Sequence, residues 1–356
     1  MRRAVVITAC AIAVLSGRPV PAAQDDTPLA RAFDLYAAAD YDGMLRSLAS
    51  RQAYAIALRD LDRVMGVWRR DWRPRRIAFL VEAGIIGVRR EFPDAEQFLF
   101  AARDLTTERV TRPGQSPEQD AFEIMVHRAA IAVFEGSGRL TDIDTYLKSI
   151  SKRVVPIRGE PSTLLDPRIA LAQAFVNEMR LRPSDIVARS GPETPSLVTA
   201  VRDNRARDHV RAAIAALDTA AEHAETAPEA ALHRAYLVTR LGRPQEAVDL
   251  LDVTRSTMAT DELRYLSHLF SGRALVALQQ PAGAITQFEA AARVLPNAQT
   301  PAVALTSLLV QAGRRDEARQ WAEVARTRRG IDPWWLYWTG DYRLLPRWLG
   351  ELRKAS

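Results

Sequence analysis

The histidines and carboxylates of this chain are not spaced as a catalytic or metal-binding motif requires. None of its five histidines belongs to a His-Glu-x-x-His arrangement, which would place two zinc ligands on one helix face. Asp142 and Asp144 open a stretch with helical spacing, where acids cap a helix and favour its dipole. The sequence also has no Gly-rich phosphate loop and no Gly-x-Ser-x-Gly nucleophile motif. We therefore predict a protein that is not an enzyme and has no metal site and no cofactor.

Arginine and tryptophan gather in "WRRDWRPRR", residues 68–76. Such a basic, aromatic patch could bind an acidic lipid, a peptide or a glycan. We favour the alternative, a corner between two helices in which Pro74 starts the second helix and arginine stems cover apolar surface. The candidate surface patch comprises Trp68, Arg69, Arg70, Trp72, Arg73, Arg75 and Arg76.

The elements that position side chains in the C-terminal half are helices that repeat. Three stretches begin with a turn and continue as a helix with an alanine at one fixed place: Ala247, Ala284 and Ala318. Each is preceded by another stretch with helical spacing. A small residue where two helices cross lets them approach closely, and glycine accepts the backbone conformation of the turn. The pattern therefore predicts three helix–turn–helix units.

These units resemble the tetratricopeptide repeat, a helix–turn–helix of 34 residues. The middle unit carries the family's residues at the family's spacings: Gly272, Ala284, Phe288, Ala291 and Pro296. The other two keep their turn glycines, but all three lack the opening tryptophan and the mid-helix tyrosine of the consensus. The resemblance covers roughly residues 227–330. It implies an all-α fold, a right-handed helical-repeat solenoid.

The resemblance also implies where a partner binds. Tetratricopeptide arrays curve so that the first helix of each unit lines a concave groove, which commonly holds a peptide. Arg240 and Arg273 beside Tyr236 could grip a peptide carboxylate by paired hydrogen bonds. The predicted groove residues are His233, Tyr236, Arg240, Phe270, Arg273, Ser307 and Gln311.

The end of the chain is rich in aromatic residues: "DPWWLYWTGDYRLL" spans residues 332–345. Asp332 and Pro333 predict a helix cap and first residue, and a turn at Gly340 leads into a second helix. A solenoid needs a terminal element over its last exposed face. Trp334 and Trp338 share one helix face, so we expect them to dock on the third repeat. Trp335 points elsewhere and is the one tryptophan here that we expect to be free to bind a ligand.

The N-terminal half shows weaker signs of the same rhythm. Turns near Tyr41 and Gly138 separate stretches with helical spacing, and "IAFLVEAGIIGV", residues 77–88, fits a core helix better than a membrane span. Six prolines interrupt residues 156–200, which contain one clear helix at 166–181. We expect five regions: a signal peptide at 1–23, an N-terminal helical region at 24–155, a Pro-rich connector at 156–200, the repeat array at 201–330 and C-terminal capping helices at 331–356.

Residues 1–23 have the features of an export signal. Two arginines precede a twelve-residue apolar core, and small residues allow cleavage near Ala23. The apolar core is too short to span a bilayer comfortably, so we expect no membrane span in the mature chain. Cleavage would remove the single cysteine, Cys10, whose lipidation is disfavoured because the apolar run continues past it. Three arginines and no acids would leave with the peptide, so the formal charge falls from +6 to +3, which does not indicate nucleic-acid binding.

Together these features predict a non-catalytic, exported helical-repeat scaffold, periplasmic or secreted, that binds a protein or peptide in the bacterial cell envelope. It resembles the exported tetratricopeptide proteins of Gram-negative-type bacteria, many of which serve envelope assembly. The alternative is a peptidoglycan- or glycan-binding or -processing protein that uses the tryptophan- and arginine-rich surfaces. An enzyme within residues 25–200 is a third hypothesis, which the missing acid–base motif disfavours.

Overall fold

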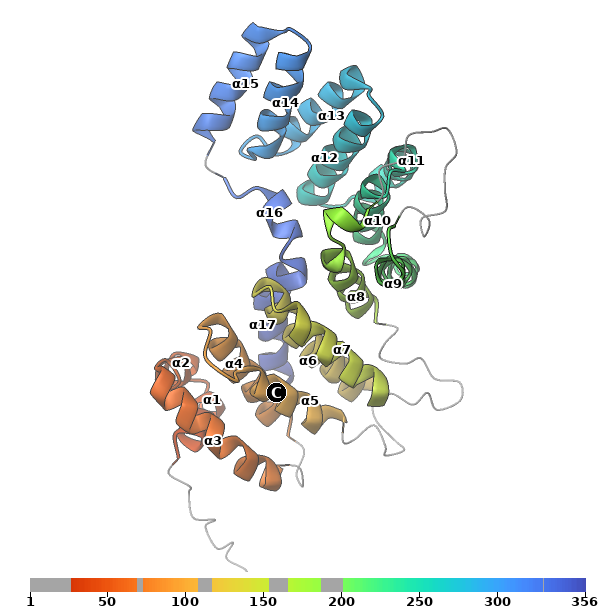
Figure 1. The fold of residues 1–356 in the computed structure, drawn as a ribbon. Coiled ribbons are helices and arrows are strands. Elements are labelled where there is room, and N and C mark those ends of the chain that lie inside the picture. The colour runs from red at the N-terminus through yellow and green to blue at the C-terminus, as the bar shows by residue number, and fades with distance from the viewer. Residues whose placement is uncertain (1–26, 69–72, 108–116, 154–165, 187–200, 329) are drawn as a thin grey trace, which may run out of the picture. The chain divides into compact units, whose positions relative to one another are not determined.

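The computed structural model describes residues 27–68, 73–107, 117–153, 166–186, 201–328 and 330–356. In these ranges the chain is all-α, as the sequence predicts, and its strand-like pairing is limited to one isolated bridge between Ile186 and Val201 (Figure 1). The chain divides into two compact units, residues 1–62 and 63–356, and the division falls inside α3 (Arg51–Trp68). The predicted signal peptide lies outside the described residues.

The described part of the first unit contains α1 (Pro28–Ala37), α2 (Tyr41–Ser47) and most of α3. Thr27 caps α1 by accepting a hydrogen bond from the amide of Ala30, and Asp40 caps α2 in the same way from Gly43. Helices α1 and α2 pack together through buried apolar side chains, among them Leu29 and Met44.

The second unit contains the remaining helices. The first group is α4 (Pro74–Arg89), α5 (Glu96–Thr107), α6 (Pro117–Gly136), α7 (Leu140–Arg153), α8 (Pro167–Arg180) and α9 (Asn204–Ala221). The second is α10 (Ala227–Arg240), α11 (Pro244–Thr254), α12 (Asp261–Ala277), α13 (Pro281–Val294), α14 (Thr300–Gln311) and α15 (Arg315–Thr327). The chain ends with α16 (Pro333–Tyr337), the 3-10 helix η5 (Gly340–Leu344) and α17 (Leu345–Ala355). From α8 to α15 each helix packs on the next one along the chain, so this part is a helical-repeat solenoid.

The three repeats predicted from the sequence are three helix pairs in this solenoid: α10/α11, α12/α13 and α14/α15. The alanines expected at the helix crossings, Ala247, Ala284 and Ala318, are at most 3% exposed. The glycines expected at the turns, Gly242 and Gly313, have φ angles of 77° and 74°. The middle pair makes the same turn with a non-glycine residue, Gln279, at φ 59°.

The same turn recurs among the N-terminal helices. In the repeats, the amide that follows the positive-φ residue donates to the carbonyl five residues earlier, as Arg243 does to Val238. Gly138 in the second unit and Ala39 in the first have φ angles of 64° and 59°, and the amides that follow them make this bond too. The backbone therefore has the helix–turn–helix pattern expected near Gly138 and Tyr41.

Helix α8, which lies within the predicted Pro-rich connector, is part of the solenoid. Asp166 caps α8 and Pro167 is its first residue, as expected. Helix α8 packs as the partner of α9 and also lies against α6, α7 and α10. No helix in the described ranges has both the length and the apolar composition needed to cross a bilayer.

Candidate functional site

The predicted groove residues lie along α10, α12 and α14. The rings of Tyr236 on α10 and Phe270 on α12 are 5.3 Å apart, and the Arg240 guanidinium lies 5.6 Å from the Tyr236 ring. On α14, Ser307 and Gln311 are exposed. The groove positions counted from the repeat alanines therefore share one face of the three helices.

Much of this groove is filled by the C-terminal segment, residues 331–356. The rings of Trp334 and Trp338 each pack against Tyr236, with centroids 5.4 and 5.5 Å away, and Trp334 also lies 5.6 Å from Phe270. These contacts correct our expectation that both tryptophans dock on the third repeat. After α15 the chain turns back along the stack, so the aromatic face reaches α10 and α12 of the first and second repeats.

Asp332 fixes the point at which the segment enters the groove. It is fully buried and caps α16, as predicted, by accepting a hydrogen bond from the Trp334 amide. Its carboxylate also accepts bonds from the Tyr265 hydroxyl at 2.6 Å and from the Thr300 amide at 2.8 Å. Burial and the bond to Asp332 raise the pKa of the Tyr265 hydroxyl, which therefore remains a donor. One side chain thus ties the segment to both α12 and α14.

The two arginines expected to grip a partner's carboxylate are engaged by the chain itself. The Arg273 guanidinium lies 4.0 Å from the Trp334 ring, and burial lowers its pKa. Arg240 donates a hydrogen bond to the Leu181 carbonyl at 2.8 Å. Both side chains therefore already contact other parts of the chain, and Arg273 also lines the hollow described below.

Tyr337 enters a polar site at the base of the groove. Its hydroxyl donates to the Glu178 carboxylate at 3.0 Å and lies 3.0 Å from His233 Nδ1. The Tyr337 and His233 rings stack with centroids 4.6 Å apart. Burial, together with the Glu178 charge, raises the pKa of the Tyr337 hydroxyl well above its usual value. His233, predicted to face a partner, therefore contacts the C-terminal segment.

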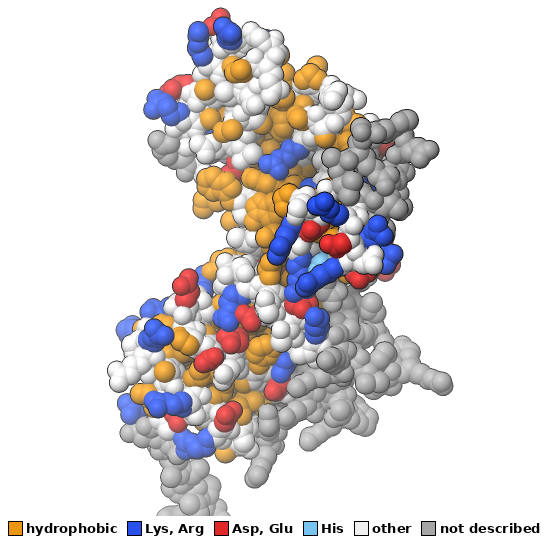
Figure 2. Space-filling view, in the orientation of Figure 1, with side chains coloured by type: hydrophobic (Ala, Val, Ile, Leu, Met, Phe, Trp, Pro, Cys, Tyr) orange, Lys and Arg blue, Asp and Glu red, His pale blue; other side chains and the backbone are white. Residues whose placement is uncertain are grey.

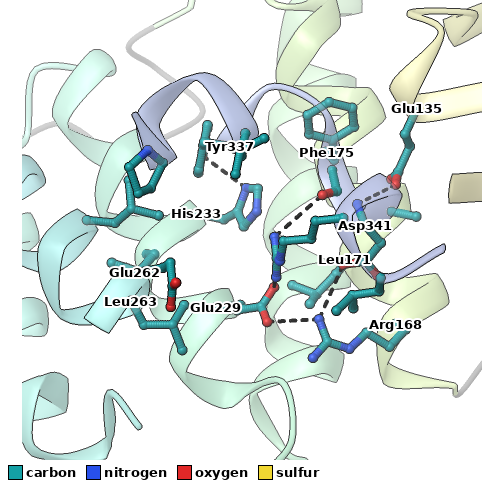
Figure 3. Close-up of a pocket in the computed structure, with 18 of the residues that line it drawn as sticks. Glu135, Arg168, Leu171, Phe175, Glu229, His233, Glu262, Leu263, Tyr337 and Asp341 are labelled. Atoms are coloured by element: carbon teal, nitrogen blue, oxygen red, sulfur yellow. Dashed lines mark hydrogen bonds and ion pairs between the residues drawn. The ribbon is translucent and has the colours of Figure 1, made fainter. Parts of the chain in front are cut away.

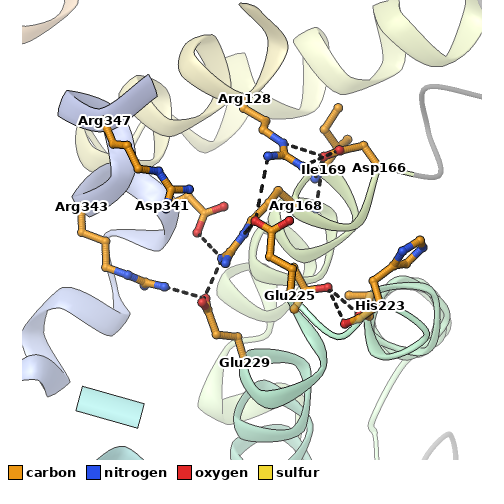
Figure 4. Close-up of polar contacts among 12 residues, drawn as sticks. Arg128, Asp166, Arg168, Ile169, His223, Glu225, Glu229, Asp341, Arg343 and Arg347 are labelled. Carbon is orange, nitrogen blue, oxygen red and sulfur yellow. Dashed lines mark hydrogen bonds and ion pairs between the residues drawn. The ribbon is translucent and has the colours of Figure 1, made fainter. Parts of the chain in front are cut away.

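Beyond Tyr337 the segment is held by a buried charged network (Figure 4). Arg168 on α8 donates to Glu229 at 2.9 Å and to Asp341 at 3.3 Å, and Arg343 donates to the other oxygen of Glu229 at 2.6 Å. Burial of Asp341 raises its pKa to about 6, although Arg168 opposes the rise. The network joins α8, α10 and η5, and no local sequence motif indicates it.

Helix α17 completes the attachment by packing on α6 and α4. Trp348 is buried there, and Arg353 forms a two-bond ion pair with Glu82 on α4. The C-terminal segment therefore contacts α4, α6, α8, α10, α12 and α14 of the second unit.

One part of the groove remains open. Between α12 and α14 lies a hollow of about 350 Å³ lined by Arg273, Ser307 and Gln311 together with apolar side chains. Val303, which is 54% exposed, and Val276 are among the apolar residues that solvent reaches. Figure 2 shows hydrophobic side chains gathered on this face of the second unit. The predicted groove is thus occupied over α10 and α12 and open towards α14.

The described residues of the arginine and tryptophan patch lie at the end of α3 and the start of α4. Trp68 is buried with its ring 6.2 Å from that of Phe79, and the Arg76 guanidinium lies 5.3 Å from the Trp68 ring. Pro74 is the first residue of α4, and Arg73 and Arg75 are exposed. Trp68 is therefore not a surface aromatic, because its ring fills the corner. The other members of the predicted patch, Arg69, Arg70 and Trp72, lie outside the described residues.

Trp338→Ala should lower the free energy of unfolding by about 2 kcal/mol, because it removes a half-buried ring from the aromatic cluster. Trp335→Ala is the matched control: its side chain is 53% exposed, so we expect a change below about 0.5 kcal/mol. Urea unfolding followed by circular dichroism measures both. Equal losses from the two variants would contradict the packing described for this segment.

Comparison with known proteins gives no relative from which a function can be transferred. No protein-family model matches the chain, and no curated protein matches it. Within the described ranges no group of three or more histidine, cysteine, aspartate or glutamate side chains could hold a metal ion.

Proposed function

We propose that this protein is a non-catalytic tetratricopeptide-type scaffold that is exported and binds a protein or peptide of the cell envelope. The helix pairs, the buried alanines Ala247, Ala284 and Ala318, and the positive-φ turns support the family. The charged start and apolar core of residues 1–23, which predict an export signal, support the proposed location.

The observation that carries the proposal is that the groove already holds a polypeptide segment. It receives three aromatic side chains, stacks Arg273 on one of them and binds the buried carboxylate of Asp332 through Tyr265 and Thr300. Apolar anchors in a groove and a bound carboxylate are recurring modes of peptide recognition. The open hollow between α12 and α14 continues the same groove and offers a partner apolar surface with polar residues at its edge.

The glycan alternative has less support. Sugar stacking needs exposed aromatic faces, and among the described tryptophans Trp335 alone is mostly exposed. The others are buried or half-buried.

Photo-crosslinking in the native cell envelope tests the proposal. A benzophenone amino acid at Val303 should crosslink to a defined partner, whereas one at Val253, a 79% exposed residue of α11, should not. Ser307→Trp, which fills the open hollow from an exposed position, should weaken the Val303 crosslink at least fivefold. Mass spectrometry of the same sample should find a mature N-terminus near residue 24.

Identical crosslinks from Val303 and Val253, or none from either position, would refute binding in the groove. A chain that keeps residues 1–23 and stays in the cytoplasm would refute export.

A further inference from the structure

A second cavity borders the C-terminal segment. It has a volume of about 480 Å³ and is bounded by α8, α10, α12, Glu135 of α6 and the C-terminal segment (Figure 3). Ligand pockets in proteins commonly have this size. Most of the wall is apolar and includes Leu171, Phe175, Leu232, Leu263, Leu266 and Leu336.

The polar end of this cavity is lined by three acids, Glu135, Glu229 and Asp341, and by two arginines, Arg168 and Arg343. Glu135, Asp341 and Arg168 are buried, Glu229 is half-buried and Arg343 is exposed. Both arginines are paired: Arg168 with Glu229 and Asp341, and Arg343 with Glu229. No arginine of the cavity is therefore left to attract an anion at its buried end.

Glu135 is the acid without a cation. It is 3% exposed, and its Oε2 accepts the Asp341 amide at 2.7 Å, but it forms no ion pair with any residue in the described ranges. Gly340 allows this contact: its φ is 54°, and a Cβ there would lie 2.4 Å from the Glu135 carboxyl group. Such a buried carboxylate is stable only if it takes up a proton or receives a positive charge.

The surroundings of Glu135 favour its protonated form. Burial and the neighbouring Asp341 charge raise the pKa of Glu135 well above its usual value, and Arg343 opposes the rise. A cation brought into the cavity would reverse this balance, because its charge would stabilise ionised Glu135. The apolar wall would at the same time cover an apolar body attached to the cation.

We propose that this cavity binds a small amphiphilic cation: a primary ammonium or guanidinium group, held by Glu135, on an apolar chain that lies against the leucines of α8, α10 and α12. Arg347 and Glu262 line the cavity too, and both are exposed. The cavity shares no lining residue with the open hollow between α12 and α14, so this proposal and the proposed binding of a partner can fail independently.

Three probes with a similar apolar chain separate the contribution of the charged group from that of the apolar chain: hexylamine, hexan-1-ol and hexanoate. Isothermal titration of the full chain at pH 7 should show saturable binding of hexylamine at least tenfold tighter than that of the alcohol, and none of hexanoate. The nearby cation should also lower the pKa of Glu135, because it stabilises the ionised carboxylate. Titrations in two buffers with different ionisation enthalpies measure any proton released on binding.

Glu135→Gln keeps the shape of the side chain and removes the charge that the proposal needs. We expect this variant to lose at least tenfold in affinity for hexylamine, to release no proton and to bind hexan-1-ol unchanged. Glu323→Gln is the matched control, since Glu323 is an exposed residue of α15 paired with Arg326, and it should bind like the unaltered chain.

Equal affinities for the amine and the alcohol would overturn the proposal, because the polar end would then not recognise charge. Preferred binding of hexanoate, or an unchanged affinity of Glu135→Gln for hexylamine, would overturn it as well. So would the absence of any binding at millimolar probe concentrations.

Discussion

Arg168→Met should lower the free energy of unfolding by about 3–5 kcal/mol at pH 8, the range expected when one partner of a buried ion pair is removed. The Arg168 side chain is 7% exposed and donates to Glu229, Asp341 and Glu225. Methionine fills a similar volume, so the loss comes mainly from charge. Arg343 would remain near Glu229 and Asp341, but the charge of one arginine cannot neutralise two carboxylates.

Arg319→Met is the matched control for Arg168→Met. Its pair with Asp316 is fully on the surface, with both side chains at least 79% exposed, so we expect less than about 0.5 kcal/mol. In the double variant Arg168→Met/Asp341→Asn the uncompensated charge is reduced, and part of the stability should return. Urea unfolding at pH 8 measures all three variants. A loss below 1 kcal/mol for Arg168→Met, or a double variant no more stable than Arg168→Met alone, would show that the network contributes little.

The repeats could be predicted from the sequence because their signals are local. A turn glycine indicates a backbone conformation, and an alanine five residues later indicates a helix crossing within the same unit. Gly242 with Ala247 and Gly313 with Ala318 behave in this way. The middle turn shows the limit of the rule, since Gln279 adopts the same conformation without the glycine that would indicate it.

The docking of the C-terminal segment could not be predicted in the same way. The spacing of Trp334 and Trp338 shows that one helix face is buried, but it does not say against which helices. That depends on the direction of the chain after α15, and the contact between Asp332 and Tyr265 that fixes it joins residues 67 positions apart. Part of the predicted groove is consequently a packing surface for the chain itself.

The buried charges had a signal in the sequence that we did not use. Glu82 is the one acid in the otherwise apolar stretch 77–88. A helix that is apolar nearly all round is buried, so a charge inside it needs a partner. That partner is Arg353, 271 positions away. Glu135 and Glu178 likewise follow apolar runs, and their environments could be found only once the helices were assembled.

The other large effect that we expect is an unusual dependence of stability on pH, revealed by Asp341→Asn. The groups that face Asp341 are Arg168 on α8, Glu229 on α10, Arg343 in η5, Glu135 on α6 and His233 on α10. Burial raises the folded-state pKa of Asp341 from 3.8 to about 6, so the folded state holds this proton more tightly than the unfolded chain does. The stability contributed by the proton is therefore fully present below about pH 4 and is lost as the pH rises through 6.

At pH 8 Asp341 is ionised in both states, and the pKa difference corresponds to about 3 kcal/mol against the folded state. Asparagine has no charge to bury and can still accept the Arg168 hydrogen bond. Asp341→Asn should therefore be about 3 kcal/mol more stable than the unaltered chain at pH 8 and less than about 1 kcal/mol more stable at pH 4.

Asp316→Asn is the control: its side chain is 90% exposed, so its stability relative to the unaltered chain should not change with pH. Urea midpoints between pH 4 and pH 8 measure the effect. A lower stability of Asp341→Asn at pH 8 would contradict this prediction. It would mean that Arg168 stabilises ionised Asp341 by more than burial destabilises it, so that the two residues form a stabilising ion pair at neutral pH.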